Sequence, residues 1–210
     1  MTEPDESGGL RFFGAIAASV SHELNNIITI IDQVNGLLQD LLVASQAGPP
    51  IKMEQLKTIH ERIARQTGRG VEIVHNLNRF AHGVDEPLLQ FELNSALRNL
   101  LELARRILDL KKVKLVAHYS NDEIVVTASP FCIQQLVFHC LQEFRDSSGE
   151  APEISVSVLR EDLLAVIAVS GPEITFAQPA TRGTAVVRDE CRDGRSTVRI
   201  EVPLLRQAGG

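Results

Sequence analysis

Apolar residues recur along the N-terminal part of the chain with the spacing of a helix seam. They fall at Phe13, Ala17, Val20, Leu24, Ile27, Ile31, Val34, Leu38 and Leu41, in alternating steps of four and three. This heptad pattern predicts a single helix from about Leu10 to Ser45, roughly 50 Å long at 1.5 Å per residue. Further apolar residues widen the stripe, which favours a four-helix bundle over a two-stranded coiled coil.

A second amphipathic run follows a clear helix stop. The AGPP segment at 47–50 ends the first helix, because Gly and paired Pro cannot continue it. The later run carries apolar residues at helical spacing from Met53 to Phe80. We therefore expect a long antiparallel helical hairpin. One hairpin cannot cover both apolar stripes, so the pattern predicts a homodimer in which two hairpins form the bundle.

Shorter segments of alternating character replace the long helices after the predicted linker GVDEP at 83–87. The expected elements are helices at 92–110 and 130–147, strands at 114–120 and 123–129 around an Asn-Asp turn, a hairpin of 153–162 with 163–171, and a last strand at 196–205. Such a mixture predicts a two-layer α/β sandwich in a protein of the α+β class. We divide the chain into a disordered acidic tail (1–9), the helical hairpin (10–86) and the α/β domain (87–210).

Composition narrows the classes of function. The 210 residues carry a net charge of −6 and contain no Lys/Arg-rich block, which argues against nucleic acid or an anionic membrane surface as partner. The longest uninterrupted apolar run is far shorter than the ~20 residues of a membrane span, and the acidic N-terminus is unlike a secretory signal. Three cysteines lie in separate segments without a CxxC pair. We expect a cytoplasmic protein without disulfide, bound metal or membrane contact.

A polar block, SVSHELNN at 19–26, interrupts the middle of the apolar helix. In the heptad, His22 falls at position f, which points away from the bundle core. The residues around it on the helix are small or short and polar, whereas an ordinary solvated face carries Lys, Glu and Arg. The cleared positions predict a surface for docking another protein; its members are Ala15, Ala18, Ser19, Asn25 and Thr29.

The chemistry of the block suits phosphoryl transfer. A neutral imidazole nitrogen is a competent nucleophile near pH 7. Glu23 is placed to hold the other ring N–H, and Asn26, one turn on, to bond a phosphoryl oxygen or orient a water. The alternative is a surface histidine without function. The cleared surface and the HExxN spacing favour a functional histidine.

The stretch FFGAIAASVSHELNNIITII resembles the H-box of bacterial histidine kinases, and RGVEIVHNLNRFAHG at 69–83 is similar to the end of the second helix of their phosphoacceptor hairpin. The resemblance implies that His22 is the phosphoacceptor and that Glu23 is its acid/base partner. It also implies that Asn26 assists phosphoryl transfer or dephosphorylation. The family often has Pro after the Asn, where this chain has Ile27.

The C-terminal part resembles the ATP-binding domain of the same kinases. PFCIQQLVFHCLQEFRDSS at 130–148 is similar to the family's N-box, in which an Asn binds Mg²⁺ with the nucleotide. Gln135 and Asp146 match the box, while His139 and Glu143 replace its two Asn and Phe144 replaces a small Ala. The resemblance therefore implies a degenerate N-box.

The boxes that follow are also degenerate. The family's adenine-binding Asp is missing from VSGPEI at 169–174. Gly183 is the only glycine between Gly171 and Gly194, so no glycine-rich phosphate loop can form. The segment 184–192 is expected to be the helix that follows this loop in the family. The resemblance implies that the fold is kept while ATP binding and autokinase activity are lost.

A phosphoacceptor hairpin without an ATP site resembles a dimeric histidine phosphotransferase. The resemblance implies exchange of a phosphoryl group between His22 and the aspartate of a response-regulator receiver domain, free-standing or in a hybrid histidine kinase. Mg²⁺ would be bound by the receiver, and no cofactor by this chain. Three alternatives stay open: a non-catalytic pseudokinase scaffold that binds receivers, a receiver phosphatase using Glu23 and Asn26, and an ATP-dependent kinase.

Overall fold

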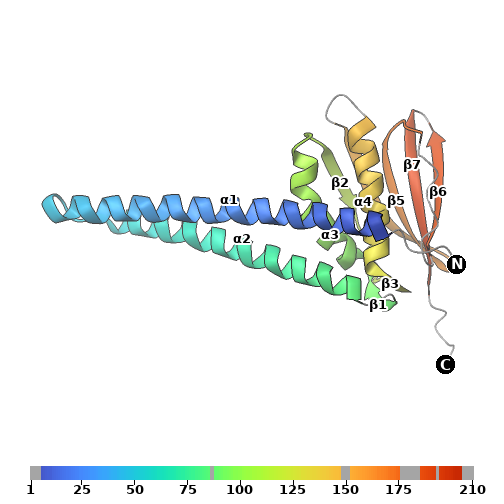
Figure 1. The fold of residues 1–210 in the computed structure, drawn as a ribbon, viewed down its shortest axis with the longest axis horizontal. Coiled ribbons are helices and arrows are strands. Elements are labelled where there is room, and N and C mark those ends of the chain that lie inside the picture. The colour runs from blue at the N-terminus through green and yellow to red at the C-terminus, as the bar shows by residue number, and fades with distance from the viewer. Residues whose placement is uncertain (1–5, 86–87, 148–151, 176–184, 193, 205–210) are drawn as a thin grey trace.

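Two long helices form a stalk that projects from an α/β domain (Figure 1). The computed structural model describes residues 6–85, 88–147, 152–175, 185–192 and 194–204. Helix α1 spans Glu6–Ala47 and α2 spans Met53–Asp85. The predicted hairpin is confirmed, and the Gly-Pro-Pro turn separates its helices. α1 begins earlier than predicted, because residues 6–9 of the expected disordered tail form its first turns; residues 1–5 lie outside the described part.

The two helices of the stalk pack along one side of the heptad. Val20, Ile27 and Val34, all at position d, are almost fully buried. Gly70 of α2 faces this seam, since a Cβ added there would lie 3.8 Å from Cγ2 of Ile27. The opposite side of the stripe stays open. The large apolar side chains of the two stalk helices that are exposed in the single chain are Leu10, Ile28, Leu37, Leu42, Val43, Met53, Val71, Val74 and Val84.

By length and composition, helix α1 could cross a membrane, although the sequence analysis predicts no membrane span. Its Ser7–Gln46 segment is long and apolar enough to cross a membrane, with a mean hydropathy of 1.4 in its most apolar window and 11% of that window buried. Core helices of soluble proteins and N-terminal signal sequences can be equally long and apolar. The absence of membrane contact and the cytoplasmic location therefore stay predictions.

The α/β domain has two layers, with two helices on one face of a five-stranded sheet (Figure 1). The sheet order is β2-β4-β5-β7-β6. Its strands are β2 (Lys114–His118), β4 (Glu153–Glu161), β5 (Leu164–Pro172), β6 (Val186–Arg192) and β7 (Arg195–Pro203), and the helices are α3 (Leu93–Asp109) and α4 (Pro130–Ser147). The predicted α+β class, with a helical hairpin followed by a two-layer domain, is confirmed.

Two predictions about the sheet region are wrong, one about a strand pairing and one about a helix. The segments at 114–120 and 123–129 do not pair with each other: β2 runs parallel to β4, and β3 (Val125–Ala128) pairs antiparallel with the short strand β1 (Leu89–Glu92) in a separate sheet. The segment expected to form a helix at 184–192 contains β6, an edge strand antiparallel to β7. Its charged residues suit an edge, where Arg188 pairs with Glu201 of β7 at 3.2 Å.

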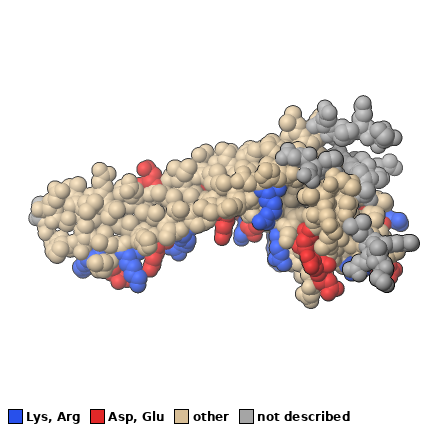
Figure 2. All heavy atoms as spheres, turned by 90° about the horizontal axis from the view of Figure 1, so that it is seen from below, with Lys and Arg blue, Asp and Glu red and all other residues tan. Residues whose placement is uncertain are grey.

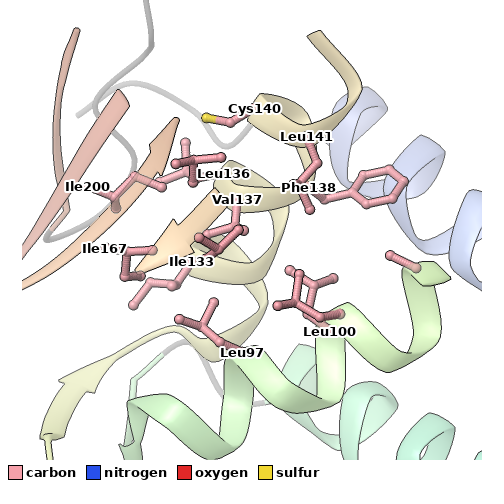
Figure 3. Packing of buried hydrophobic residues seen from close by; sticks show 14 of the residues in the cluster. Leu97, Leu100, Ile133, Leu136, Val137, Phe138, Cys140, Leu141, Ile167 and Ile200 are labelled. Carbon is pink, nitrogen blue, oxygen red and sulfur yellow. The ribbon is translucent and has the colours of Figure 1, made fainter. Parts of the chain in front are cut away.

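The hydrophobic core of the α/β domain extends into the base of the stalk. Between α3, α4 and the sheet, aliphatic side chains such as Leu97, Ile133 and Ile167 pack together (Figure 3). Phe12 of α1 and Phe80 of α2 belong to the same cluster. The ring centroid of Phe12 lies 5.3 Å from that of Phe80, and 5.2 and 5.0 Å from the rings of two α4 residues, Phe131 and Phe138. The stalk and the domain are therefore joined by packing.

Candidate functional site

His22 lies near the middle of α1 with its side chain exposed. It follows Val20, which packs toward the seam, so the helical turn directs the imidazole to the other side. Among the residues that the structure describes, no side chain or backbone group forms a hydrogen bond or ion pair with the imidazole of His22. The imidazole is thus presented to solvent from a rigid helix.

The Glu23 carboxylate forms no hydrogen bond or ion pair with His22 and pairs instead with the second helix of the stalk. Its Oε1 forms an ion pair with Nη2 of Arg69 in α2. The Glu23 side chain is 19% exposed and that of Arg69 is 56% exposed, so the pair lies at the edge of the interhelical groove. The carboxylate beside the candidate phosphoacceptor is therefore held toward α2.

Two cavities meet at this ion pair. The larger, of about 730 Å³, lies between the stalk and α3, and polar side chains of Glu72, Asn76 and Arg106 contribute to its walls. The smaller, of about 390 Å³, lies further along the stalk and is lined by Asn26 and Gln66, among others. Glu23 and Arg69 line both cavities.

The smaller cavity also contains an unsatisfied polar atom. Oε1 of Gln66 is buried and has no hydrogen-bond partner in the described part of the chain. A buried acceptor of this kind usually binds a water molecule. Asn26 is exposed and borders the same cavity, so it can reach solvent on one side and this polar pocket on the other.

Only part of the predicted docking surface is free. Ala18, Asn25 and Thr29 are exposed, as a docking surface requires. Ala15 is half-buried and packs against the domain core. Ser19 is a correction: it is 5% exposed, and its hydroxyl donates a hydrogen bond of 3.1 Å to the backbone oxygen of Leu103 in α3. The α/β domain covers this position because α3 packs across the stalk.

The residues of the degenerate N-box lie along α4. Gln135 is buried, His139 is exposed and Glu143 is half-buried. Asp146 is exposed and accepts hydrogen bonds of 2.8 and 2.6 Å from its neighbour Arg145. This guanidinium lowers the pKa of Asp146 below its ordinary value, although partial burial opposes the shift. The carboxylate is therefore already occupied by a cation.

Phe144, where the resembled family has a small residue, is fully buried. Its ring lies against Gly171 of β5, and a Cβ added at Gly171 would stand 2.6 Å from Cγ of Phe144. The aromatic ring therefore occupies space between α4 and the sheet that a small residue would leave open.

The described part of the chain contains no candidate metal site, and its buried cysteine Cys140 is not reactive. In the described ranges, no group of three or more His, Cys, Asp or Glu side chains is placed to hold a metal ion. Cys140 is buried, and burial raises the pKa of its thiol to about 12. It packs as a small apolar side chain in the core.

Reasoning from the sequence missed Arg69 and Gln66. Both lie in the polar middle of α2, where helical periodicity is weak and Gly68 and Gly70 interrupt it. Their place beside Glu23 depends on the register between the two helices. The sequence offered one indication of these residues. Polar side chains occupy positions of α2 that face the first helix in a hairpin.

Several solved structures have a fold similar to that of this chain. No protein-family model matches the sequence. No curated protein matches it either. Among solved structures it is similar to histidine kinase ThkA in complex with the response regulator protein TrrA, with 18% identity over 97% of this chain and 65% of that chain, at a TM-score of 0.49.

Two further solved structures extend over most of the chain. A bacterial phosphotransferase is 10% identical, covering 95% of this chain and 98% of its own, with a TM-score of 0.48. The histidine kinase AdeS of Acinetobacter baumannii is 14% identical, covering 88% and 98%, with a TM-score of 0.45. Identities and TM-scores at this level indicate a similar fold and no more.

Proposed function

We propose that this protein is a dimeric histidine phosphotransferase of a two-component phosphorelay. It exchanges a phosphoryl group between His22 and the aspartate of a receiver domain, without ATP-dependent autophosphorylation. The observation that carries the proposal is the imidazole of His22, exposed in mid-stalk without a partner in the described residues and flanked by exposed Ala18, Asn25 and Thr29. Such a ring is accessible to a group carried by another protein.

The reaction needs little from the chain beyond placement. A lone pair on one ring nitrogen of His22 attacks the phosphorus of the aspartyl phosphate. The N–P bond forms as the P–O bond to the aspartate breaks, and the carboxylate leaves with the electron pair. Mg²⁺ on the receiver stabilises the charge of the phosphoryl oxygens. For this step the His22 ring turns toward Glu23, which accepts a hydrogen bond from the other ring nitrogen, and Asn26 bonds a phosphoryl oxygen.

The α/β domain supports transfer without autokinase activity. Phe144 fills space beside Gly171, and β6 extends the sheet in the segment where the resembled family places a helix after its phosphate loop. We propose that this domain anchors the stalk and does not bind ATP. Isothermal titration calorimetry with ATP and Mg²⁺ tests whether the domain binds ATP. Saturable binding would contradict the proposal.

The dimer is proposed from the open apolar side of the stalk. Ile28 is 62% exposed and Leu42 is 50% exposed, both at position e beside the half-buried residues of position a. In Figure 2 much of the visible stalk surface carries no charged side chain, and most Lys, Arg, Asp and Glu lie along one edge. A second hairpin would bury such a surface.

A second copy suits α1 better than a bilayer does. A bilayer would enclose His22 and Glu23 in mid-helix, at the depth where ionisable groups cost most. We therefore propose a cytoplasmic homodimer. Light scattering should give twice the chain mass of 23.1 kDa, whereas a single-chain mass or recovery only in detergent would contradict the proposal.

Phosphoryl transfer itself is tested by labelling His22. The response-regulator receiver domains of the source genome, free-standing and from hybrid kinases, are charged with acetyl [³²P]phosphate and mixed with the chain. We expect at least one to label the chain with an acid-labile, base-stable phosphoryl group, and His22→Ala to abolish the label. Equal labelling of His22→Ala, or no labelling of the native chain by any receiver, would overturn the proposal.

The same assay separates the alternatives. A receiver that binds the chain without transferring label would favour a scaffold. A receiver that loses phosphate without labelling the chain would favour a phosphatase, for which Asn26 and the buried Oε1 of Gln66 are the groups that could orient a water. Asn78→Ala, a matched amide change on an exposed part of α2, is the control for Asn26→Ala.

A further inference from the structure

One ion pair joins the two stalk helices at the level of the candidate phosphoacceptor. Nη2 of Arg69 contacts Oε1 of Glu23, which directly follows His22. A carboxylate offers about four lone-pair sites on two oxygens, so one engaged by a guanidinium can still accept a bond from an imidazole N–H. Glu23 therefore has the capacity to bridge Arg69 and His22.

Glu23 needs such an anchor to act on its neighbour. Successive side chains of an α-helix point in directions about 100° apart, so adjacent residues do not face each other. A Glu side chain has several rotatable bonds, and holding them in one conformation costs conformational entropy. Without Arg69 the carboxylate would sample many positions, few of them within reach of the His22 ring.

We propose that Arg69 is a positioning residue for phosphoryl transfer. It holds the Glu23 carboxylate at the edge of the interhelical groove, and the His22 ring, which forms no hydrogen bond with Glu23 in this structure, turns to donate its N–H to that carboxylate during transfer. The inference rests on the proposed phosphotransfer at His22 and adds a residue from the second helix to it. Arg69, Glu23 and His22 act as one unit, in which the third group orients the partner of the nucleophile.

The local structure of α2 favours this role. Arg69 stands between Gly68 and Gly70, and a Cβ at Gly68 would meet nothing within 4 Å. Neither glycine places a side chain beside that of Arg69. Because Gly70 lies against Ile27, α2 comes close to α1 one helical turn beyond Glu23. The resulting pair forms part of the wall of both cavities.

The structure also offers a matched control. Arg105 of α3 lines the same 730 Å³ cavity and pairs with Glu102 at 3.8 Å, on the same helix. Its side chain is 68% exposed, comparable with the 56% of Arg69. Ion pairs at such exposed positions contribute little to folding. Removing either charge should therefore leave the fold intact, and only the loss of Arg69 should affect Glu23.

The test measures transfer from the labelled receiver to His22 at rising receiver concentration. We expect Arg69→Gln to lower the maximal transfer rate roughly 10- to 100-fold, as loss of an orienting partner does, with an unchanged half-saturating concentration. Arg69→Lys should retain most of the rate, because it keeps a cation in place. Arg105→Gln should behave as the native chain. A change only in half-saturation would assign Arg69 to docking and overturn the inference.

A double-variant cycle separates positioning from direct action. If Arg69 acts only through Glu23, the chain with both Glu23→Gln and Arg69→Gln should transfer no more slowly than Glu23→Gln alone. Losses that multiply would show that Arg69 acts on the phosphoryl group itself and would overturn the inference. A native chain labelled by no receiver would refute the proposed function. A labelled native chain with an unaffected Arg69→Gln variant would refute only the role of Arg69.

Discussion

At position 144 a phenylalanine ring occupies the space that a side chain at position 171 would need. Phe144 is fully buried in α4, and Gly171 lies opposite it in β5. A Cβ at Gly171 would approach Cγ and Cε1 of the ring to 2.6 and 2.9 Å, closer than non-bonded carbons tolerate. The large residue on the helix therefore requires the absence of a side chain on the strand.

Replacing that glycine should destabilise the domain. We expect Gly171→Ala to lower the free energy of unfolding by about 1–3 kcal/mol, the usual cost of overpacking a core. Urea unfolding followed by circular dichroism measures the loss.

The control is the same substitution without the ring. In a Phe144→Ala background, adding Gly171→Ala should cost much less, because the conflicting atoms are gone. Equal stability of Gly171→Ala and the native chain would show that the ring is not confined against Gly171.

The burial and contacts of a single residue could be predicted from the sequence where they depend on neighbouring residues of the same helix. The outward direction of His22 follows from the heptad, because the seam residues of the same helix determine which face is buried. The burial of Ser19 does not follow, since its partner Leu103 lies 84 residues away on α3. The same holds for Arg69, whose contact with Glu23 depends on how α2 is aligned with α1.

At the scale of elements, helices were easier to predict than strand pairings. Periodicity and stop signals lie within the segment itself, so the extents of α1, α2 and α4 follow from the sequence to within a few residues. The hairpin of β4 and β5 was also local, with Glu161 opposite Leu164. The partner of a strand is set by distant segments, and alternation alone does not distinguish β2 beside β4 from β2 beside β3.

Helix α1 contains a glycine that costs it stability without serving any contact in the chain. Gly36 lies in the helix interior at position f, and a Cβ there would meet nothing within 4 Å. We expect Gly36→Ala to raise the free energy of unfolding by about 0.5–1 kcal/mol, because Ala loses less backbone entropy on entering a helix. Urea midpoints at equal protein concentration measure the change.

A glycine in the turn between β6 and β7 provides the control. A Cβ at Gly194 would likewise meet nothing within 4 Å, but its φ is +70°, in the left-handed region that side chains disfavour. Gly194→Ala should therefore lower stability by about 1 kcal/mol. The opposite signs distinguish a backbone effect from any general effect of added methyl groups. A destabilised Gly36→Ala chain would reveal a contact on that face of the stalk.

At the scale of the whole molecule, the stalk and the α/β domain share one core. Phe12 and Phe80 at the base of the stalk belong to the same buried cluster as Phe138 of α4. The hydrogen bond from Ser19 to Leu103 adds a polar contact between α1 and α3. The predicted linker at 83–87 is wrong for residues 83–85, which form the end of α2, while 86–87 lie outside the described residues. Because the stalk and the domain pack into one core, the two parts should unfold together.

The chain carries separate natural reporters for its two parts. It has no Trp and a single Tyr, Tyr119, which lies in the α/β domain with the guanidinium of Arg98 at 3.6 Å from its ring. Helical circular dichroism comes mainly from the stalk, since α1 and α2 contain 42 and 33 residues against 17 and 18 in α3 and α4. Tyrosine fluorescence and dichroism thus follow different parts of the molecule.

Phe12→Ala should weaken both parts at once. Removing this ring takes away contacts with Phe80, Phe131 and Phe138, and truncations of this kind cost about 3–5 kcal/mol. In urea, fluorescence and dichroism should give one common midpoint in the native chain and one common, lower midpoint in the variant. Leu163→Ala, at a side chain 54% exposed between β4 and β5, should leave both unchanged. If dichroism shifts while fluorescence stays, the shared core does not couple stalk to domain, and His22 stands on an independently folding stalk.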